Sequence, residues 1–522
     1  MNRAILFRGS ASTGLALIIV MSLPALAGEW QIKPRIEVRE GFTDNVLLTN
    51  KNRKTDFFTT VSPGLGVSGQ GARLKLDLDL ALNYDAYLRE TSLNGFRQDL
   101  RGFGTVTLLE NNLFLDLSGF VGQSPAVGRG QTSAIDRRVG GNQTGGESQF
   151  YSYSFSPYWR TGLGSWGTGE ARYRFNQLFS KSNNSTSTTA ASASNVGLLS
   201  DTTVHQFSGF LQSGENFNRF RWRSSFDVTN SESAGVSGTN SSREFKRRTF
   251  DFQPSYVVNR WLTLLGTVGH EKIESSGFSQ DLSGVFWNAG FRLTPSERTS
   301  FELTYGDRYN GQNWSSSFST TLDAGTTMSF SYRETVETQA LQALSNLGFL
   351  QRDATTGQLV DRRTGLPFNG RDPNFNQNDQ TFLSKAFVLS ISLPRERNTY
   401  LVSIQHTIRD SQIESVTPNS GRSDKSIGLT ASWTHQLTPT ISSTATASYS
   451  DSTTDSGGTS ARGKSKTFRG EVSLRYEMNP SLNATAGLAH IQRDISGPQF
   501  FSNEFSGAYS ENVAFLTLRK TF

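Results

Sequence analysis

The sequence predicts an all-β fold, a transmembrane antiparallel up-and-down β-barrel of about 22 strands. Apolar and polar residues alternate along most segments, as from Phe301 to Gly306, which is the two-residue period of a strand with one apolar face. The mean hydropathy is −0.43 although the chain holds 37 Phe, 14 Tyr and 8 Trp. Short turns also alternate with long polar segments along the whole chain. A barrel explains all three features, because its strands point alternate side chains toward lipid and toward a watery lumen.

The first 27 residues are typical of a secretory signal peptide. Arg3 and Arg8 form a basic head, Gly14 to Leu23 form an apolar centre, and Ala25 to Ala27 form an A-x-A ending. The apolar centre is too short to span a bilayer as a helix. We therefore expect residues 1–27 to be removed, and residues 28–522 to form one exported barrel.

Charge and cysteine content limit the function classes. Without Arg3 and Arg8, the 51 basic residues become 49 against 45 acidic residues, a balance of +4. This small excess predicts no binding of nucleic acid. The absence of cysteine and the presence of only five histidines predict neither a disulfide framework nor a structural zinc site, so backbone pairing must stabilise the fold.

About ten short turn segments divide the chain, and most alternate with longer segments rich in Ser, Thr, Asn and Gly. The longer segments include residues 123–147, 181–202, 231–242 and 451–466, and we expect a further polar connection from Asp307 to Gln312. Ten turns and two chain ends predict about 22 strands, with 18 or 20 as alternatives, and place both termini in the periplasm. The predicted turns are Gly69–Arg73, Glu110–Leu113, Gly162–Gly167, Glu215–Arg219, Asn259–Trp261, Pro295–Arg298, Asp323–Thr326, Pro394–Asn398, Thr438–Thr440 and Asn479–Leu482.

Alternation within the strands also assigns their faces. Phe220 to Val228 places aromatic and apolar residues at even positions and polar or charged residues at odd positions. A charged side chain on the lipid side at mid-bilayer would cost about 2–4 kcal/mol, so the charged rows must face inward. We predict that the lumen is lined by Arg172, Arg174, Arg221, Arg223, Arg247, Arg475, Asp227, Glu471 and Glu477. Trp166 and Trp261 lie beside predicted turns, where an aromatic girdle is expected.

Residues 338–380 break the strand pattern and are predicted to form a long loop insertion. The insertion begins with the helix-compatible segment Ala340 to Leu344, and two Asp-x-x-Thr-Gly repeats between Asp353 and Gly365 predict Asx-type turns. So long a loop is usually functional. Two alternatives remain open, a constriction folded into the lumen and a cap over the mouth that has no specific ligand.

The final segment, Ala514 to Phe522, alternates and ends on an aromatic residue. This ending resembles the signal by which the barrel assembly machinery recognises outer-membrane proteins. Ala514, Leu516, Leu518 and Phe522 fit that pattern, whereas Lys520 stands where an apolar residue or tyrosine is usual. The resemblance implies two partners, the assembly machinery and outer-membrane lipid.

The beginning of the predicted mature chain resembles the outer-membrane β-barrels associated with the PEP-CTERM and exosortase system. The segments that carry the likeness are Trp30–Pro34, Phe42–Val46, Asp56–Phe58, Ser62–Leu65, Leu82–Tyr84 with Tyr87, and Glu110–Leu115. The likeness is most specific over roughly the first hundred mature residues. It implies an accessory protein in the outer membrane of Gram-negative bacteria, linked to exopolysaccharide synthesis and export, and it supplies no catalytic residues.

No spacing in the sequence predicts an enzyme, a metal site or a cofactor. His270-Glu271-Lys272-Ile273-Glu274 opens like the zinc-protease motif but lacks the second histidine, and it lies on an alternating segment and not on a helix. Serines abound, but none is paired by spacing with a base. A plugged, energised transporter would need a globular domain before its first strand, and here alternation begins by about Gln31.

We therefore expect a passive channel or an accessory protein of exopolysaccharide export, with polysaccharide or periplasmic export components as further partners. A lumen lined by both signs of charge suits hydroxyl-rich or anionic polymers, because guanidinium groups grip carboxylates. Equally, the charges could pair only with one another and stiffen the wall. One alternative function is a nutrient-uptake porin. A second is a surface scaffold or adhesin, in which the loops near Asn142, Asn184 and Asp353 bind a partner.

Overall fold

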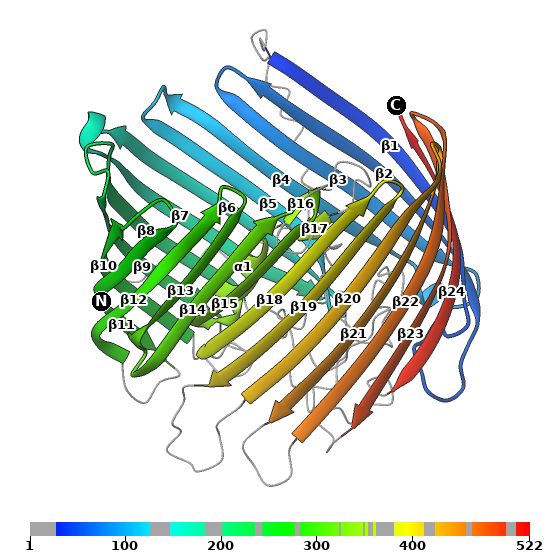
Figure 1. Cartoon of the computed structure of the whole chain (residues 1–522). Coiled ribbons are helices and arrows are strands. Elements are labelled where there is room, and N and C mark those ends of the chain that lie inside the picture. Colours follow the sequence, from blue (N-terminus) through cyan, green and yellow to red (C-terminus); the bar gives the residue numbers. More distant parts are fainter. Residues whose placement is uncertain are drawn as a thin grey trace, which may run out of the picture.

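A computed structural model describes most of the chain as one closed barrel (Figure 1). The described residues are 28–125, 147–182, 201–234, 243–276, 282–322, 325–347, 350–352, 359–361, 381–411, 423–455, 462–496 and 508–522. The predicted signal peptide and the adhesin loop positions Asn142, Asn184 and Asp353 lie outside these ranges, as does nearly all of the segment with the predicted Asx turns.

The wall consists of 22 strands. The strands of the first half are β1 (Gly28–Thr43), β2 (Asp56–Gly71), β3 (Leu74–Tyr87), β4 (Gly95–Leu109), β5 (Leu113–Pro125), β6 (Glu147–Gly162), β7 (Gly167–Ser182), β8 (Thr202–Ser213), β9 (Phe220–Ser233), β10 (Arg243–Val257) and β11 (Leu262–Ser275). Those of the second half are β12 (Leu282–Ser296), β13 (Thr299–Arg308), β14 (Gly311–Thr321), β15 (Thr327–Thr338), β18 (Thr381–Arg395), β19 (Asn398–Ser411), β20 (Ser423–Thr438), β21 (Ile441–Asp455), β22 (Arg462–Asn479), β23 (Leu482–Ser496) and β24 (Tyr509–Thr521).

Each strand pairs antiparallel with its neighbours in sequence, and β1 closes the ring by pairing with β24 from Arg35↔Thr521 to Thr43↔Val513. The backbone N–H of Phe522 extends this seam by donating to the carbonyl oxygen of Pro34 at 2.8 Å. Closure leaves no strand of the wall with an unpaired edge. The prediction of an antiparallel up-and-down barrel with 22 strands is confirmed.

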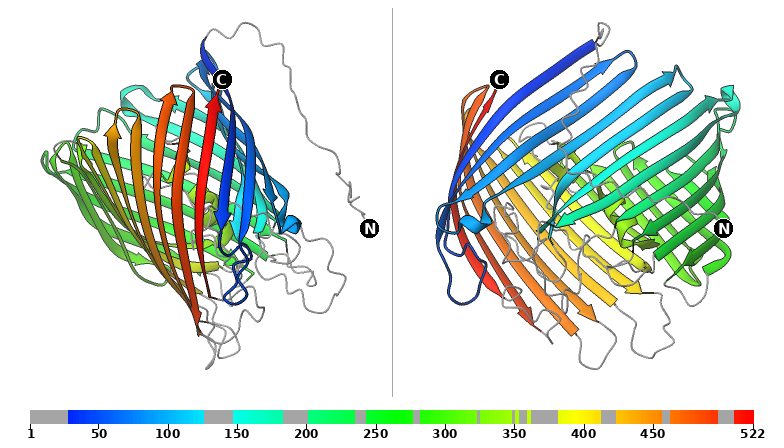
Figure 2. Two further views of the ribbon diagram at one scale, coloured as in Figure 1. Left: turned by 90° about the vertical axis from the view of Figure 1, so that its right-hand side faces the viewer. Right: turned by 180° about the vertical axis from the view of Figure 1, so that it is seen from behind.

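The two ends of the barrel differ. All the predicted short turns lie at one end, which we call the turn end and which is uppermost in Figure 1; β1 begins and β24 ends there. At the opposite end, the loop end, most strands are separated by more residues, and the connections between β1 and β2 and between β3 and β4 are among those that the structure describes (Figure 2). Short 3-10 helices occur at both ends, η1 (Thr91–Leu93) at the loop end and η2 (Gly164–Trp166) at the turn end.

Two predictions of loop boundaries were wrong. The expected polar connection from Asp307 to Gln312 is a two-residue turn, in which Tyr309 and Asn310 adopt φ values of 60° and 59°. Such a left-handed pair matches the twist of a hairpin and allows both strands to continue. Strands also extend into the predicted polar segments, for example to Ser233 in β9, because the backbone groups of polar residues pair as well as those of apolar ones.

The outer face of the wall is apolar along its middle. Outward residues include Phe250, Val285, Trp287, Val472 and Leu488, all of which are largely exposed to the surroundings of the barrel. Toward the loop end the outer face becomes charged, with ion pairs between Lys246 and Glu244 and between Lys272 and Glu274. Within the described residues, no helix combines the length and the apolar character that crossing a bilayer requires.

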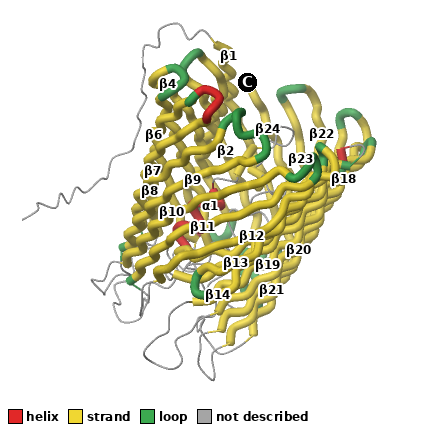
Figure 3. Tube along the Cα trace, turned by 60° about the vertical axis from the view of Figure 1, so that its left-hand side comes forward, coloured by secondary structure: helices red, strands yellow, loops and turns green. Residues whose placement is uncertain are grey.

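One helix, α1 (Gln339–Leu347), follows β15 directly and lies inside the ring of strands (Figure 3). Its start is explained by Thr338, whose Oγ1 accepts the N–H of Leu341 at 3.3 Å in the manner of an N-cap. The predicted helical character of residues 340–344 is confirmed. Beyond α1, the described part of the insertion is a small hairpin of β16 (Leu350–Arg352) and β17 (Leu359–Asp361).

Candidate functional site

The inner face of the wall is identified by its contacts with α1. Phe120, Phe150 and Leu178, on β5, β6 and β7, form one buried cluster with Ala340, Ala343 and Leu347 of the helix. Side chains alternate along a strand, and directly paired residues share a face. The strand register therefore extends this assignment from one strand to the next around the ring.

The structure places every sequence-predicted lumen residue on this inner face. On β7, Arg172 and Arg174 are separated from the inward residue Leu178 by an even number of positions, so they share its face. Leu178 pairs with Thr202, which therefore points inward on β8. Gln212 lies on the same inner face of β8 as Thr202, and it pairs with Arg223, so Arg223 also points inward. The remaining predicted residues are assigned to the inner face in the same way, namely Arg221, Asp227, Arg247, Glu471, Arg475 and Glu477.

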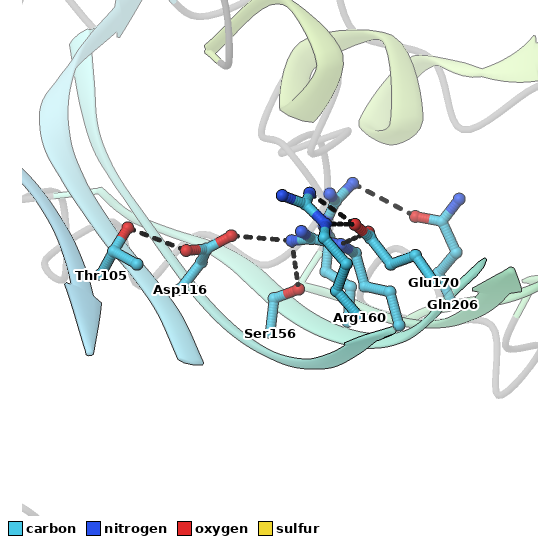
Figure 4. A network of polar contacts seen from close by, with 8 residues as sticks. Thr105, Asp116, Ser156, Arg160, Glu170 and Gln206 are labelled. Atoms are coloured by element: carbon cyan, nitrogen blue, oxygen red, sulfur yellow. Dashed lines mark hydrogen bonds and ion pairs between the residues drawn. The ribbon is translucent and has the colours of Figure 1, made fainter. Parts of the chain in front are cut away.

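A network of ion pairs covers the inner face of β5 to β7 (Figure 4). Arg172 donates to Asp116 Oδ2 at 2.8 Å and to Glu170 Oε1 at 3.0 Å, and its guanidinium lies 3.9 Å from the ring centre of Tyr158. Glu170 also accepts from Arg160 at 2.6 Å. We call the inner residues of β5 to β10 in this region, Asp116, Arg160, Glu170, Arg172, Arg174, Arg223, Asp227 and Arg247, the charged wall.

Further along the ring, the inward charges pair within one strand or with a neighbouring strand. Arg469 and Glu471 on β22 approach to 2.9 Å, and Arg475 and Glu477 approach to 3.2 Å. Some inward charges are deeply buried, such as Arg97 and Asp85, whose atoms lie 2.9 Å apart. Pairing offsets part of the cost of removing these groups from water.

Apart from Asp424 near the loop end, the inner faces of β20 and β21 are neutral and rich in hydroxyl groups. Their side chains hydrogen-bond in cross-strand pairs, Ser432 with Thr446 and Thr434 with Thr444, each at 3.2 Å. A similar pair, Ser329 with Ser390 at 2.8 Å, joins β15 and β18. We call these six residues the hydroxyl wall; its β20–β21 part lies across the ring from the charged wall. The lumen is thus charged on one side and neutral but polar on the other.

Helix α1 lies in the lumen between the β15–β18 hairpin and the inner face of β5 to β7. At its origin, Gln342 donates to Glu337 at 3.0 Å and to Ser384 at 3.2 Å, and accepts from Arg409 at 2.6 Å. On the opposite side of the helix, Ala340, Ala343 and Leu347 pack in one buried cluster with Phe150 and Leu178. Because contacts hold α1 on both sides, the helix narrows the lumen at this level. The described start of the insertion therefore folds into the lumen, which is the first of the two alternatives that the sequence left open.

The loop end of the β15–β18 hairpin also leans into the lumen. Val336 packs with Phe245 and Ile273, which belong to β10 and β11 and not to neighbouring strands. Ser275, at the end of β11, bonds with Thr381 at 2.7 Å. Tyr309 packs against the same cluster, and its burial raises the pKa of its hydroxyl above the ordinary value. The hairpin tip therefore narrows the mouth beside α1.

A second inward segment closes the mouth from the other side. In the connection between β1 and β2, Val46 and Leu48 are buried against Phe58, Ile491 and other inward residues near the β1–β24 seam. Its conformation is held by Asn45, whose Nδ2 donates to the carbonyl oxygens of Thr49 at 2.7 Å and Ser510 at 2.9 Å. The sequence prediction missed this segment, although the apolar run Val46-Leu47-Leu48 inside a polar connection is a signal that could have indicated it.

Several residues lie on the outer face. Phe522 is 72% exposed at the turn end of the seam. Trp166 and Trp261 lie at turns of the same end and are largely exposed, as an aromatic girdle requires. His270, which opens the incomplete zinc motif, also points outward, whereas Glu271 points inward and binds Arg308 at 2.7 Å. The two residues of the motif thus lie on opposite sides of the wall.

Comparison with known proteins gives similarity in structure only. No protein-family model matches the chain, and no curated protein matches it either. Among solved structures, the FrpB iron transporter from Neisseria meningitidis is similar in its F5-1 apoprotein form, with a TM-score of 0.52 and 12% identity, over 94% of this chain and 81% of that one. Its F3-3 variant gives a TM-score of 0.51 and 11% identity over 94% and 81%. A mutant of the ferric enterobactin receptor PfeA from Pseudomonas aeruginosa gives 0.49 and 11% over 94% and 80%.

At this level of identity, the likeness to the two FrpB structures concerns the fold. It agrees with the closed ring, the apolar outer band and the polar lumen described above. The protein is a 22-stranded antiparallel β-barrel of the bacterial outer membrane, with a fold like that of outer-membrane transporters.

Proposed function

We propose that the protein is a passive conduit for polar solutes, narrowed near the loop end by α1, the β15–β18 hairpin tip and the connection between β1 and β2. The observation that carries this proposal is the lumen itself, which is polar and charged from the turn end up to the three apolar clusters near the loop end. An inert anchor would need no lumen lined by so many charged and hydroxyl-bearing side chains.

The solute pathway that we propose is export associated with exopolysaccharide. Its support is the resemblance of the first hundred mature residues to barrels of the PEP-CTERM and exosortase system. The second candidate is uptake of small solutes, which the likeness in fold to FrpB favours. Neither role requires catalysis, and we propose none.

Conductance tests the channel proposal directly. Purified full-length protein in planar bilayers is expected to give discrete current steps in potassium chloride, because water and ions fill a polar lumen. A barrel that inserts, shows the heat-dependent gel mobility of a folded barrel and stays electrically silent would refute the conduit.

Gene deletion separates the two pathways. Loss of surface polysaccharide without a growth defect supports export, whereas normal polysaccharide with slow growth on a particular carbon or iron source supports uptake. Complementation with the intact gene must restore the phenotype in either case.

A further prediction concerns assembly, for which we propose Phe522 as the recognition signal. Phe522→Ala is expected to lower the amount of folded barrel in the outer membrane several-fold, because the exposed ring is lost while the seam hydrogen bond from its backbone remains. Thr521→Ala, one residue earlier and on the inner face, is the matched control. Equal membrane levels for both variants, measured by fractionation and heat-modified gel mobility, would exclude this role for the ring.

A further inference from the structure

Two guanidinium groups of the charged wall have no carboxylate within ion-pairing distance among the described residues. Arg174 donates to the amide oxygen of Gln206 at 3.4 Å, a long hydrogen bond. Arg223 makes an equally long bond to Gln212, and its flat face lies 3.9 Å from the ring centre of Phe210. Both guanidinium groups are thus hydrogen-bonded only to neutral partners and make no direct ion pair among the described residues.

The carboxylates nearby are already occupied. Asp116 and Glu170 are bound by Arg172, and Glu170 also by Arg160. Asp227 accepts from Gln206 at 2.5 Å and from Thr229 at 2.8 Å, and lies 3.6 Å from Arg247. The wall therefore presents two free cationic positions beside a saturated network.

The two positions are arranged along the length of the lumen. Gln206 and Gln212, which contact Arg174 and Arg223, lie on the same face of β8. Their separation of six residues corresponds to about 20 Å along a strand. Arg223 lies near the turn end of β9, and Arg174 lies further along β7, toward Leu178 and the constriction at α1. A small anion would meet one position at a time, whereas an elongated one would reach both.

From this arrangement we infer that the lumen binds an elongated polyanion bearing carboxylate groups, with Arg174 and Arg223 as its two binding positions. The inference rests on the proposed conduit and names its class of solute. Stacking on Phe210 occupies the face of the Arg223 guanidinium but leaves its N–H edge to bind a carboxylate. The hydroxyl wall on the far side supplies neutral donors and acceptors for the hydroxyl groups of a sugar polymer.

The test uses purified full-length protein and two hexasaccharides of similar size. Hexagalacturonate, which carries a carboxylate on every sugar, is expected to bind in isothermal titration calorimetry, and neutral maltohexaose is not. The double substitution Arg174→Gln and Arg223→Gln should weaken hexagalacturonate binding about tenfold or more, because two charge-assisted contacts are lost. Arg248→Gln, which removes the same charge from the outer face of β10, should leave the affinity unchanged.

Binding and conduction are measured separately, so the inference and the proposed conduit can fail independently. Equal affinity for the two hexasaccharides, or wild-type affinity in the double variant, would overturn the polyanion site even in a conducting channel. A protein that binds hexagalacturonate through both arginines and yet carries no current would overturn the conduit and leave the site. In a conducting wild type, hexagalacturonate should block the current, and the double variant should need about tenfold more of it.

Discussion

Replacement of residues 339–380 by an Asn-Gly turn is expected to raise the single-channel conductance about threefold or more, because α1 occupies part of the cross-section of the lumen. The replacement is compatible with the wall. Thr338 and Thr381 pair directly across the β15–β18 hairpin, and a two-residue Asn-Gly turn closes such a pair without disturbing the register. The measurement is the distribution of current steps in planar bilayers at fixed salt and voltage.

A pair of substitutions within α1 controls for the loss of the rest of the insertion. Ala343→Asp puts a charge into the cluster with Phe150 and Leu178, where burial of an unpaired carboxylate is costly. It should release the helix from the inner face of β5 to β7 and raise the conductance toward that of the replacement. Ser345→Asp adds the same charge to the exposed side of α1 and should change the conductance little. Unchanged conductance in both the replacement and Ala343→Asp would show that α1 does not limit the flow.

Val472→Arg is expected to destabilise the membrane-inserted barrel by about 2–4 kcal/mol, the cost of a lipid-facing arginine at mid-bilayer. Val472 is 60% exposed on the outer face of β22, four residues from each of the outward aromatic residues Phe468 and Tyr476. If these rings mark the two interfaces, Val472 lies at the centre of the apolar band. The measurement is the urea midpoint for folding into lipid vesicles, followed by tryptophan fluorescence.

The matched control is the next residue along the same strand. Ser473→Arg places the same side chain on the inner face, between Glu471 and Arg475, where water and nearby charges solvate it. We expect a loss of less than about 1 kcal/mol. Equal destabilisation at the two positions, or a larger loss at Ser473, would contradict the assignment of faces around β22.

Much of the wall could be predicted from local sequence alone. Alternation assigns Arg172 and Arg223 to one face and the residues next to them to the other, because successive side chains of a strand point to opposite faces. The short turns could be located because residues that favour reversal cluster there, as in Asn479 to Leu482. Both signals span only a few residues, so no tertiary information is needed to interpret them.

Strand lengths and partners were less predictable. Polar stretches such as Ser231 to Ser233 look like loop from their composition, but they extend a strand whenever a neighbouring strand supplies the hydrogen bonds. The connection Asp44 to Thr55 is mostly polar in composition, yet Val46 and Leu48 fold inward against strands from both ends of the chain. Such contacts depend on which surfaces closure of the ring brings together, and local patterns do not contain that information.

The sequence by itself determined the class of fold, the approximate number of strands, the turns and the inward direction of the predicted lumen residues, because each follows from local periodicity. Only the tertiary structure decided that α1 enters the lumen and that the mouth is narrowed by two segments. It also decided that Arg172 is neutralised by Asp116 and Glu170, while Arg174 and Arg223 are left with amide partners. The physical reason is that a charge acquires its partner from adjacent strands, and the register of strands distant in sequence is set only when the whole ring closes.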